Sequence, residues 1–429
     1  MKIYFYAVPL LAAVNISSFA CGDHKISLHA LSQLAVADDA GRADEAIRKL
    51  RAFGPEGLKA LLEVHAPSLA SGAPTDPKLR RAIDIASGQR DGHVSRLFWF
   101  TDLEQAKEAA QKVARPILSL HLLGRLDEEL SCANSRFFRI ALYSNSEISH
   151  YLRENFVLHW QSVRPAPRIT VDFGDGRRLE RTITGNSIHY VLAPDGKPVE
   201  ALPGLYGPKA FMSQLVASRD AAMQYAALER EKRGAFLCEF HAQRLAMTLS
   251  DWATDLATVS GEQPPNPRRA DLEARMSPEL WRLVAARYGS DSRLDPGSRA
   301  LIRAKNPPAI DAGRIAPTKM MVEDPLLRAM REFERSMAED TLRNEYLLHT
   351  QIHEWFTTAA PETTHLARLN NRVYSELFLA PATDPWLGLN PANAFTALES
   401  GGVSKSELAQ GGSQAGRSGP LDPGGRVFH

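Results

Sequence analysis

The chain has 429 residues, 44% of them hydrophobic, which is enough for more than one buried core and predicts two or three domains. Its 51 basic and 50 acidic side chains give a net charge of +1, so we expect no molecule-wide basic patch and no nucleic-acid partner. Beyond the N-terminus, no apolar run approaches the length that spans a membrane.

The first 21 residues have the pattern of a signal peptide. Lys2 supplies a short basic start, residues 3–13 are largely apolar, and Ser18-Phe19-Ala20 has the small-x-small spacing that signal peptidase reads. Cys21 follows directly and suggests a lipoprotein, although Ser18 and Phe19 fit a lipobox poorly; an uncleaved anchor is the other alternative. We therefore expect an exported protein, periplasmic or in the cell envelope, whose membrane contact is confined to a lipid on Cys21.

Residues 22–95 are expected to form a helical N-terminal region. Leucine and alanine recur at helical spacing over 28–35 and over 46–64, where Gly54-Pro55-Glu56-Gly57 interrupts the pattern. Thr101 and Glu104 then form a capping box ahead of a helix expected over 102–114.

The segment 96–220 alternates predicted strands with predicted helices. Strands are expected at 97–100, from Pro116 onward, at 157–160 and at 188–192, with helices at 134–143 and 146–154. Gly174-Asp175-Gly176 separates two alternating segments and predicts a β-hairpin. This order predicts an α/β domain.

Residues 221–398 are expected to form a helical C-terminal domain. One long helical pattern covers 220–256 and contains Cys238, and a Gly- and Pro-rich linker follows at 261–267. Further helices are expected at 271–288, 325–356 and 364–378. Glycine and serine dominate the end of the chain, so residues 399–429 are predicted to be a disordered tail.

Three motifs occur in order in the central segment. They are Lys112–Pro116 before the first long strand, Cys132-Ala133-Asn134-Ser135 at a helix start, and Asn155-Phe156-Val157 at the next strand. A strand-turn-strand over 190–198 and a closing helix over 204–215 follow. With these features, residues 97–218 resemble the thioredoxin-like fold, closest to its thioredoxin-7 and DUF255-type branch. The resemblance implies a thioredoxin-like α/β domain flanked by N-terminal and C-terminal helical regions.

The chain departs from that family at two positions. Ser135 replaces the second motif cysteine, giving Cys-x-x-Ser, and Ser187 stands where the family has its cis-proline. A Cys-x-x-Ser site can form a mixed disulfide but has no second motif thiol to resolve it. The loop before the motif carries Asp127, Glu128 and Glu129, whose charge would raise the pKa of a nearby thiol.

Cys132 is the predicted nucleophile. A helix start favours the thiolate, and Ser135, one turn further on, is expected to hydrogen-bond it. The resemblance implies that Asn186 and Ser187 face Cys132 and bind the substrate. The alternative is a buried, inert cysteine at a decayed active site.

Other residues near this region have weaker signals. Cys238 lies in an apolar helix and is expected in the core, with a resolving role for the Cys132 disulfide as the alternative. His121 and His189 lie on strands, where core packing is commoner than proton transfer.

These residues predict thiol–disulfide exchange with a protein or a small-molecule thiol or disulfide, without a cofactor. The alternative is a non-catalytic scaffold that binds a partner protein. The absent second cysteine and cis-proline favour that alternative.

A second constellation lies in the C-terminal region. Glu345, His349 and His353 have the spacing i, i+4, i+8, which puts them on one helix face. His-x-x-x-His can hold a metal ion, with Glu345 as a third ligand or as a hydrogen-bond partner of a ligand. Leu342, Ile352 and other apolar neighbours favour a helix seam, so a metal-dependent enzyme is the third alternative.

Overall fold

The computed structural model describes residues 27–70, 74–261, 268–306 and 325–387, together with 389, 397 and 398. The predicted signal peptide at 1–21, including Cys21, lies outside the described residues, as does the predicted tail at 399–429. Among the described helices, none is long and apolar enough to cross a membrane.

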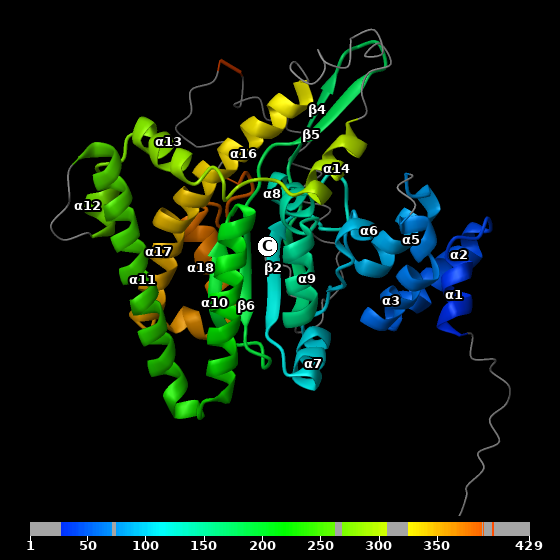
Figure 1. The fold of residues 1–429 in the computed structure, drawn as a ribbon, viewed down its shortest axis with the longest axis horizontal. Helices are drawn as coiled ribbons and strands as arrows, with labels where there is room; N and C mark the ends of the chain where they lie inside the picture. The colour runs from blue at the N-terminus through cyan, green and yellow to red at the C-terminus, as the bar shows by residue number, and fades with distance from the viewer. Residues whose placement is uncertain are drawn as a thin grey trace, which may run out of the picture.

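Short helices make up the N-terminal region, shown in blue in Figure 1. Their bounds are α1 Leu28–Leu34, α2 Ala40–Ala52, α3 Pro55–Val64, α4 Ala66–Ala70, α5 Pro77–Ser87 and α6 Gly92–Ser95. Asp39 and Asp76 cap α2 and α5 by accepting backbone N–H groups. Leu50 and Leu61 lie in a core that these helices share, separate from the core around the sheet.

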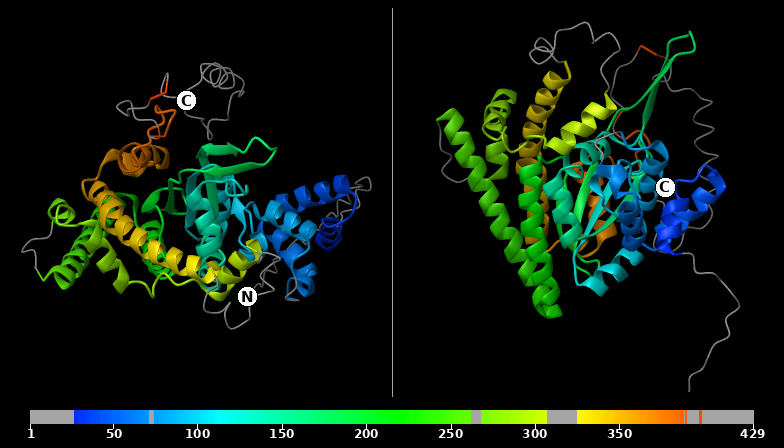
Figure 2. Two further views of the ribbon diagram at one scale, coloured as in Figure 1. Left: turned by 90° about the horizontal axis from the view of Figure 1, so that it is seen from above. Right: turned by 45° about the vertical axis from the view of Figure 1, so that its right-hand side comes forward.

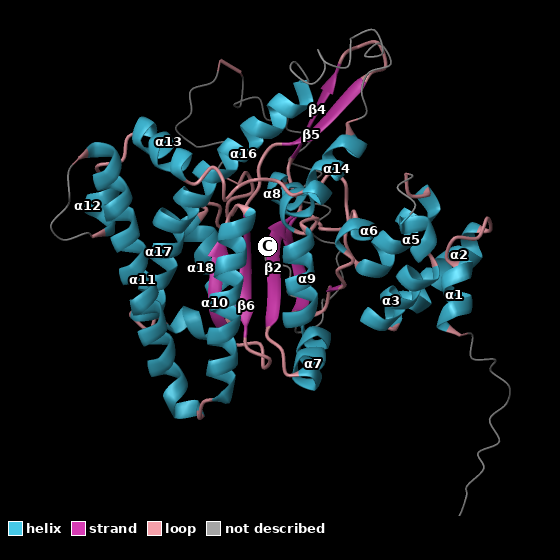
Figure 3. Ribbon diagram, viewed as in Figure 1, coloured by secondary structure: helices cyan, strands magenta, loops and turns pink. Residues whose placement is uncertain are grey.

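A five-stranded mixed sheet forms the centre of the protein (Figure 3). Its order is β1 Trp99–Phe100, β3 Val157–Arg164, β2 Ile117–Leu123, β6 Ser187–Leu192 and β7 Pro198–Pro203. Strands β1, β3 and β2 run parallel, whereas β6 is antiparallel to β2 and β7 is antiparallel to β6. Every residue of β2, β6 and β7 is buried, so these strands lie inside the molecule. The protein is therefore α/β, as the sequence predicts.

Helices cover both faces of the sheet (Figure 1). The elements between the strands are α7 Leu103–Val113, α8 Ala133–Phe137, the π-helical turn η1 Phe138–Leu142 and α9 Ser146–Asn155. Neighbouring residues of a strand point to opposite faces of the sheet. The contacts of His189 and Tyr190 on β6 therefore show which helix covers each face. The His189 ring lies 5.0 Å from the ring of Phe211 in helix α10, Pro208–Ala227. The Tyr190 hydroxyl donates to Asn370 of helix α18, Leu366–Arg372, at 3.1 Å.

The remaining helices form the C-terminal region (Figures 1 and 2). They are α11 Arg230–Ser260, α12 Arg269–Glu273, α13 Pro278–Arg287, α14 Pro296–Lys305, α16 Pro325–Arg343, η3 Asn344–His349, α17 Thr350–Thr357, η4 Pro361–Thr364 and η5 Val373–Leu377. Of these, η3 packs against β7, whereas α14 packs against η1 and lies near α8. The turns η3 and η5 are π-helical, and η4 is a 3₁₀ turn. The prediction of one helix over 220–256 is wrong, because Leu228 adopts an extended conformation and separates α10 from α11.

The predicted hairpin is confirmed and stands apart from the central sheet (Figure 2). Strands β4 Arg168–Asp172 and β5 Arg178–Thr182 pair only with each other, and glycines at 174 and 176 adopt positive φ in the turn. The register pairs Val171 with Leu179 and Ile169 with Arg181, so these side chains share one face.

Candidate functional site

Cys132 lies where the sequence predicts it, at the N-cap of α8. Its Sγ accepts the backbone N–H of Ser135 at 3.4 Å. The Ser135 hydroxyl does not make the contact that we expected, because it accepts the hydroxyl of Ser131 at 2.8 Å. The backbone, rather than the serine side chain, therefore contacts the sulfur.

The thiol is fully buried, with 0% of Cys132 exposed. Burial raises the pKa of Cys132 above its ordinary value, and the backbone N–H groups of Ser135 and Asn134 offset this only in part. The thiolate that exchange chemistry needs is therefore disfavoured in this conformation.

Ser187 begins β6 opposite the start of α8. The Asn134 amide donates to the Ser187 hydroxyl at 2.9 Å, and the Asn186 carbonyl accepts the hydroxyl of Tyr374 at 3.1 Å. A Cβ on Gly185 would meet the backbone N of Asn134 at 2.8 Å, so the loop and the helix start are tightly packed. These polar groups are thus engaged inside the protein, and no cis peptide bond occurs in the part of the chain that the structure describes.

The C-terminal segment covers this region. Tyr374 is buried, and its pKa is raised well above the ordinary value by burial and further by the nearby Cys132. Arg164, at the end of β3, donates to the carbonyls of Ala380, Pro381 and Asp384. The chain's own residues 374–384 therefore pack over the end of the sheet at which a substrate was predicted to bind.

The remaining predicted residues have structural contacts. Burial lowers the pKa of His121 to about 4 and of His189 to about 3, so both are neutral core side chains at pH 7. His121 contacts Asn370 at 3.0 Å, and His189 contacts the hydroxyl of Tyr143 at 2.7 Å. Cys238 and Cys132 are both free thiols.

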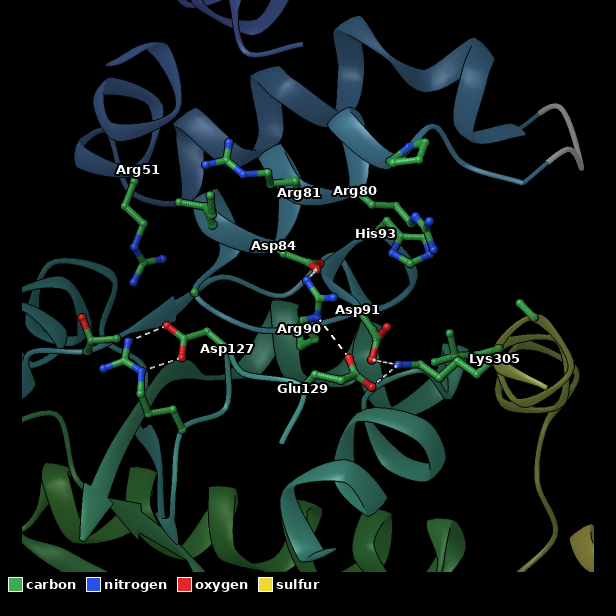
Figure 4. Close-up of a pocket in the computed structure, with 17 residues that line it drawn as sticks. Arg51, Arg80, Arg81, Asp84, Arg90, Asp91, His93, Asp127, Glu129 and Lys305 are labelled. Atoms are coloured by element: carbon green, nitrogen blue, oxygen red, sulfur yellow. Dashed lines mark hydrogen bonds and ion pairs between the residues drawn. The ribbon is translucent and has the colours of Figure 1, made fainter. Parts of the chain in front are cut away.

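The acidic loop before α8 faces a cavity rather than the thiol. This cavity, about 970 Å³ in volume, lies between α5, the loop and α14 (Figure 4). Arg90 pairs with Asp84 and Glu129, at 3.2 and 3.1 Å, and Lys305 pairs with Asp91 at 3.0 Å. These pairs offset the acidic charge locally, and burial instead accounts for the raised pKa of Cys132.

A second cluster joins β7 to the C-terminal helices. Glu200, His349 and His353 each offer a ligand atom, and these atoms lie within 4.8 Å of one another. His349 Nε2 lies 3.1 Å from Glu200 Oε1, and all three residues are fully buried. The predicted pair of histidines therefore comes together with Glu200, a residue that the sequence interpretation missed.

Glu345 has a different position from the one we expected of a ligand. Its Oε2 lies 3.3 Å from Nδ1 of His349, on the opposite side of the ring from Glu200. His241 on α11 also belongs to the cluster, since its Nδ1 lies 2.8 Å from Nδ1 of His353. A single acid in the apolar strand 198–203 was the available sequence signal for Glu200.

The electrostatics of the cluster are strongly coupled. Burial by itself lowers the pKa of His349, but the carboxylates of Glu200 and Glu345 raise it to about 9. Burial opposes ionisation of Glu200, yet the neighbouring histidines hold its pKa below the ordinary value. Burial and the charge of His349 lower the pKa of His353. The cluster therefore combines a charged histidine with a neutral one.

Comparison with known proteins gives no relative: no family model, curated protein or solved structure matches the chain.

Proposed function

We propose that this is an exported protein of the cell envelope whose central domain is thioredoxin-like and acts as a protein-binding scaffold rather than as an exchange catalyst. Two observations support the thioredoxin-like assignment. The strand order has three parallel strands followed by two antiparallel ones, and Cys132 begins a helix after β2. Both agree with what the sequence resemblance implies.

The observation that carries the scaffold proposal is the closed environment of Cys132. A thiol with no exposed surface cannot meet a disulfide of another molecule. The Tyr374 hydroxyl donates to the Asn186 carbonyl, and the Arg164 guanidinium donates to three backbone carbonyls of the same C-terminal segment. The protein's own chain thus occupies the position that an exchange partner would need.

The surface that would bind a partner is the apolar face of the β4–β5 hairpin. Its members are exposed by 36–55%. They are Ile169, Val171, Phe173, Leu179 and Ile183. An isolated two-stranded hairpin gains little stability alone, and exposed apolar faces of this kind mark interaction sites. Arg181 lies on the same face, where its guanidinium donates to the Glu180 carbonyl at 2.9 Å and makes no ion pair among the described residues, so we expect a partner protein with an apolar patch bordered by a carboxylate.

Binding through this face predicts that Val171→Asp weakens the complex by at least about tenfold, whereas Thr170→Asp on the opposite face changes it by less than about twofold. A photo-crosslinking residue at position 171 identifies the partner in cells that export the protein. Titration of that purified partner against both variants then measures the affinity. Equal affinities for the two variants would contradict the proposal.

The burial of Cys132 predicts that its thiol is alkylated slowly. In the native protein, Cys132 should react with iodoacetamide at least about 100-fold more slowly than a free cysteine, because local opening must expose it first. Peptide mass spectrometry after timed alkylation measures the rate at each cysteine separately. In urea, Cys132 should react like free cysteine, which controls for prior oxidation.

Single-thiol exchange is the second candidate function, and the N–H···S contact from Ser135 is what favours it. It requires the C-terminal segment to move away from Cys132. Tyr374→Phe removes the hydroxyl that donates to Asn186 and preserves the ring. Fast native alkylation of Cys132, accelerated further in this variant, would favour exchange over the scaffold function.

A further inference from the structure

The histidine cluster beside β7 has two buried acceptor atoms without a donor. They are Oε2 of Glu200 and Nε2 of His353, and neither has a hydrogen-bond partner. Both residues are fully buried. Buried polar atoms are nearly always paired, so two unpaired acceptors in one cluster are suited to binding a cation.

The hydrogen bonds determine which nitrogen of His353 carries a lone pair. The Val199 carbonyl can only accept, so the 3.0 Å contact from His241 Nε2 assigns a proton to that nitrogen. Nδ1 of neutral His241 is then an acceptor, and His353 Nδ1 must donate to it across 2.8 Å. Neutral His353 therefore presents an unprotonated Nε2, which is the form that binds metal ions.

A similar series of hydrogen bonds orients the ring of His349. Its Nδ1 donates to Glu345, whose other oxygen accepts the amide of Gln214 at 2.8 Å. Arg244 in turn donates to the side-chain amide oxygen of Gln214. A carboxylate on the far nitrogen is the usual support of a metal-ligating histidine, and it leaves Nε2 directed at Glu200.

Glu200 completes the set from the strand. The backbone N–H of Ala201 donates to Oε1 at 2.9 Å and orients the carboxylate. Atoms bonded to one tetrahedral Zn²⁺ at about 2.0–2.2 Å lie roughly 3.3 Å apart, so ligand atoms already within 4.8 Å need only small side-chain rotations. A proton shared between Glu200 and His349 would still leave the two other acceptors unpaired.

We propose that Glu200, His349 and His353 bind one divalent metal ion of the Zn²⁺ class. Two imidazoles and a carboxylate form a ligand set typical of zinc. The ligands come from β7 and from the junction of the π-helical turn η3 with α17, where π-helical turns often mark functional positions. Because every ligand is buried, the ion joins the sheet to the C-terminal helices.

The test uses the full chain, purified without a polyhistidine tag and stripped with a chelator. Zn²⁺ is then titrated in competition with a chromophoric chelator, and bound metal is counted by mass spectrometry. We expect about one ion per chain. Glu200→Gln and His353→Gln should each weaken binding at least about 100-fold, and Glu345→Gln about 10- to 100-fold through the orientation of His349. His150→Gln, at an exposed histidine on α9, is the matched control and should bind like the unaltered chain.

Co²⁺ gives a second measurement on the unaltered chain, independent of whether any variant folds. Ligation by nitrogen and oxygen in a four-coordinate site should produce intense visible absorption that Zn²⁺ abolishes. Absence of binding by both Zn²⁺ and Co²⁺ to a stripped chain that retains its circular dichroism spectrum would overturn the proposal. So would unchanged affinity in folded Glu200→Gln and His353→Gln.

Discussion

Glu200→Ala is expected to lower the free energy of unfolding by about 3–5 kcal/mol, even in a chelator. Glu200 is fully buried and its Oε1 lies 3.1 Å from His349 Nε2. Alanine would leave the buried imidazole with Glu345 as its remaining carboxylate partner, and a small cavity beside β7. Urea denaturation at pH 7 in the presence of EDTA, followed by circular dichroism, measures the loss without any contribution from metal binding.

Glu200→Gln is the matched control for this result. The amide keeps the shape of the side chain and one oxygen acceptor for Ala201, so it should cost less than alanine. A loss under about 1 kcal/mol for alanine would mean that the contact between the carboxylate and the histidine contributes little. Because EDTA is present throughout, that outcome would leave the proposed metal site to its own binding test.

The elements that the sequence predicted correctly depend on local signals. The helix expected over 102–114 is α7, which ends near Ala114, although its cap is Asp102, whose carboxylate accepts the backbone N–H of Gln105, and not the Thr101 that the capping box predicted. The hairpin was predicted from glycines that adopt positive φ in its turn. The position of Cys132 at a helix start follows from the pattern of neighbouring residues alone. Each of these signals acts within a few residues of the element that it determines.

The residues of both candidate sites that the sequence did not predict are brought there by contacts between distant parts of the chain. Glu200 meets His349 across 149 positions, and Tyr374 meets Asn186 across 188. No local periodicity encodes such contacts, because they depend on how the C-terminal helices pack on the sheet. Helical spacing therefore grouped Glu345 with the histidines, while the strand carboxylate that actually approaches them could not be assigned.

One run of chain connects the two sites. Residues 344–357 carry His349 and His353 to β7, and residues 366–377 continue across the sheet, where Asn370 and Tyr374 make their contacts. An ion bound by Glu200 and both histidines would fix the start of this run against the sheet. The same ion would then favour the conformation in which Cys132 stays covered.

Trp99→Ala is expected to lower the free energy of unfolding by about 3–5 kcal/mol, because it removes a large side chain from a site that is 0% exposed. The indole Nε1 donates to Gln89 at 2.8 Å, and the ring lies 5.0 Å from that of Tyr143. The backbone carbonyl of Trp99, which accepts the Arg51 guanidinium of α2 at 2.6 Å, is retained in the variant, so the loss comes from the indole alone. Urea denaturation followed by circular dichroism measures the change.

The hydrogen bond from the Trp99 indole to Gln89, which lies between α5 and α6, links the N-terminal helices to the sheet, so the form of the unfolding curve also matters. If the two regions depend on this link, the variant should lose helical signal in a separate early transition, with the N-terminal helices unfolding first. Phe53→Ala is the matched control, since that aromatic ring is 55% exposed and its loss should cost less than about 0.5 kcal/mol. A loss in Trp99→Ala as small as that of the control would show that the N-terminal helices are stable without the link, and that their own core around Leu50 and Leu61 is sufficient.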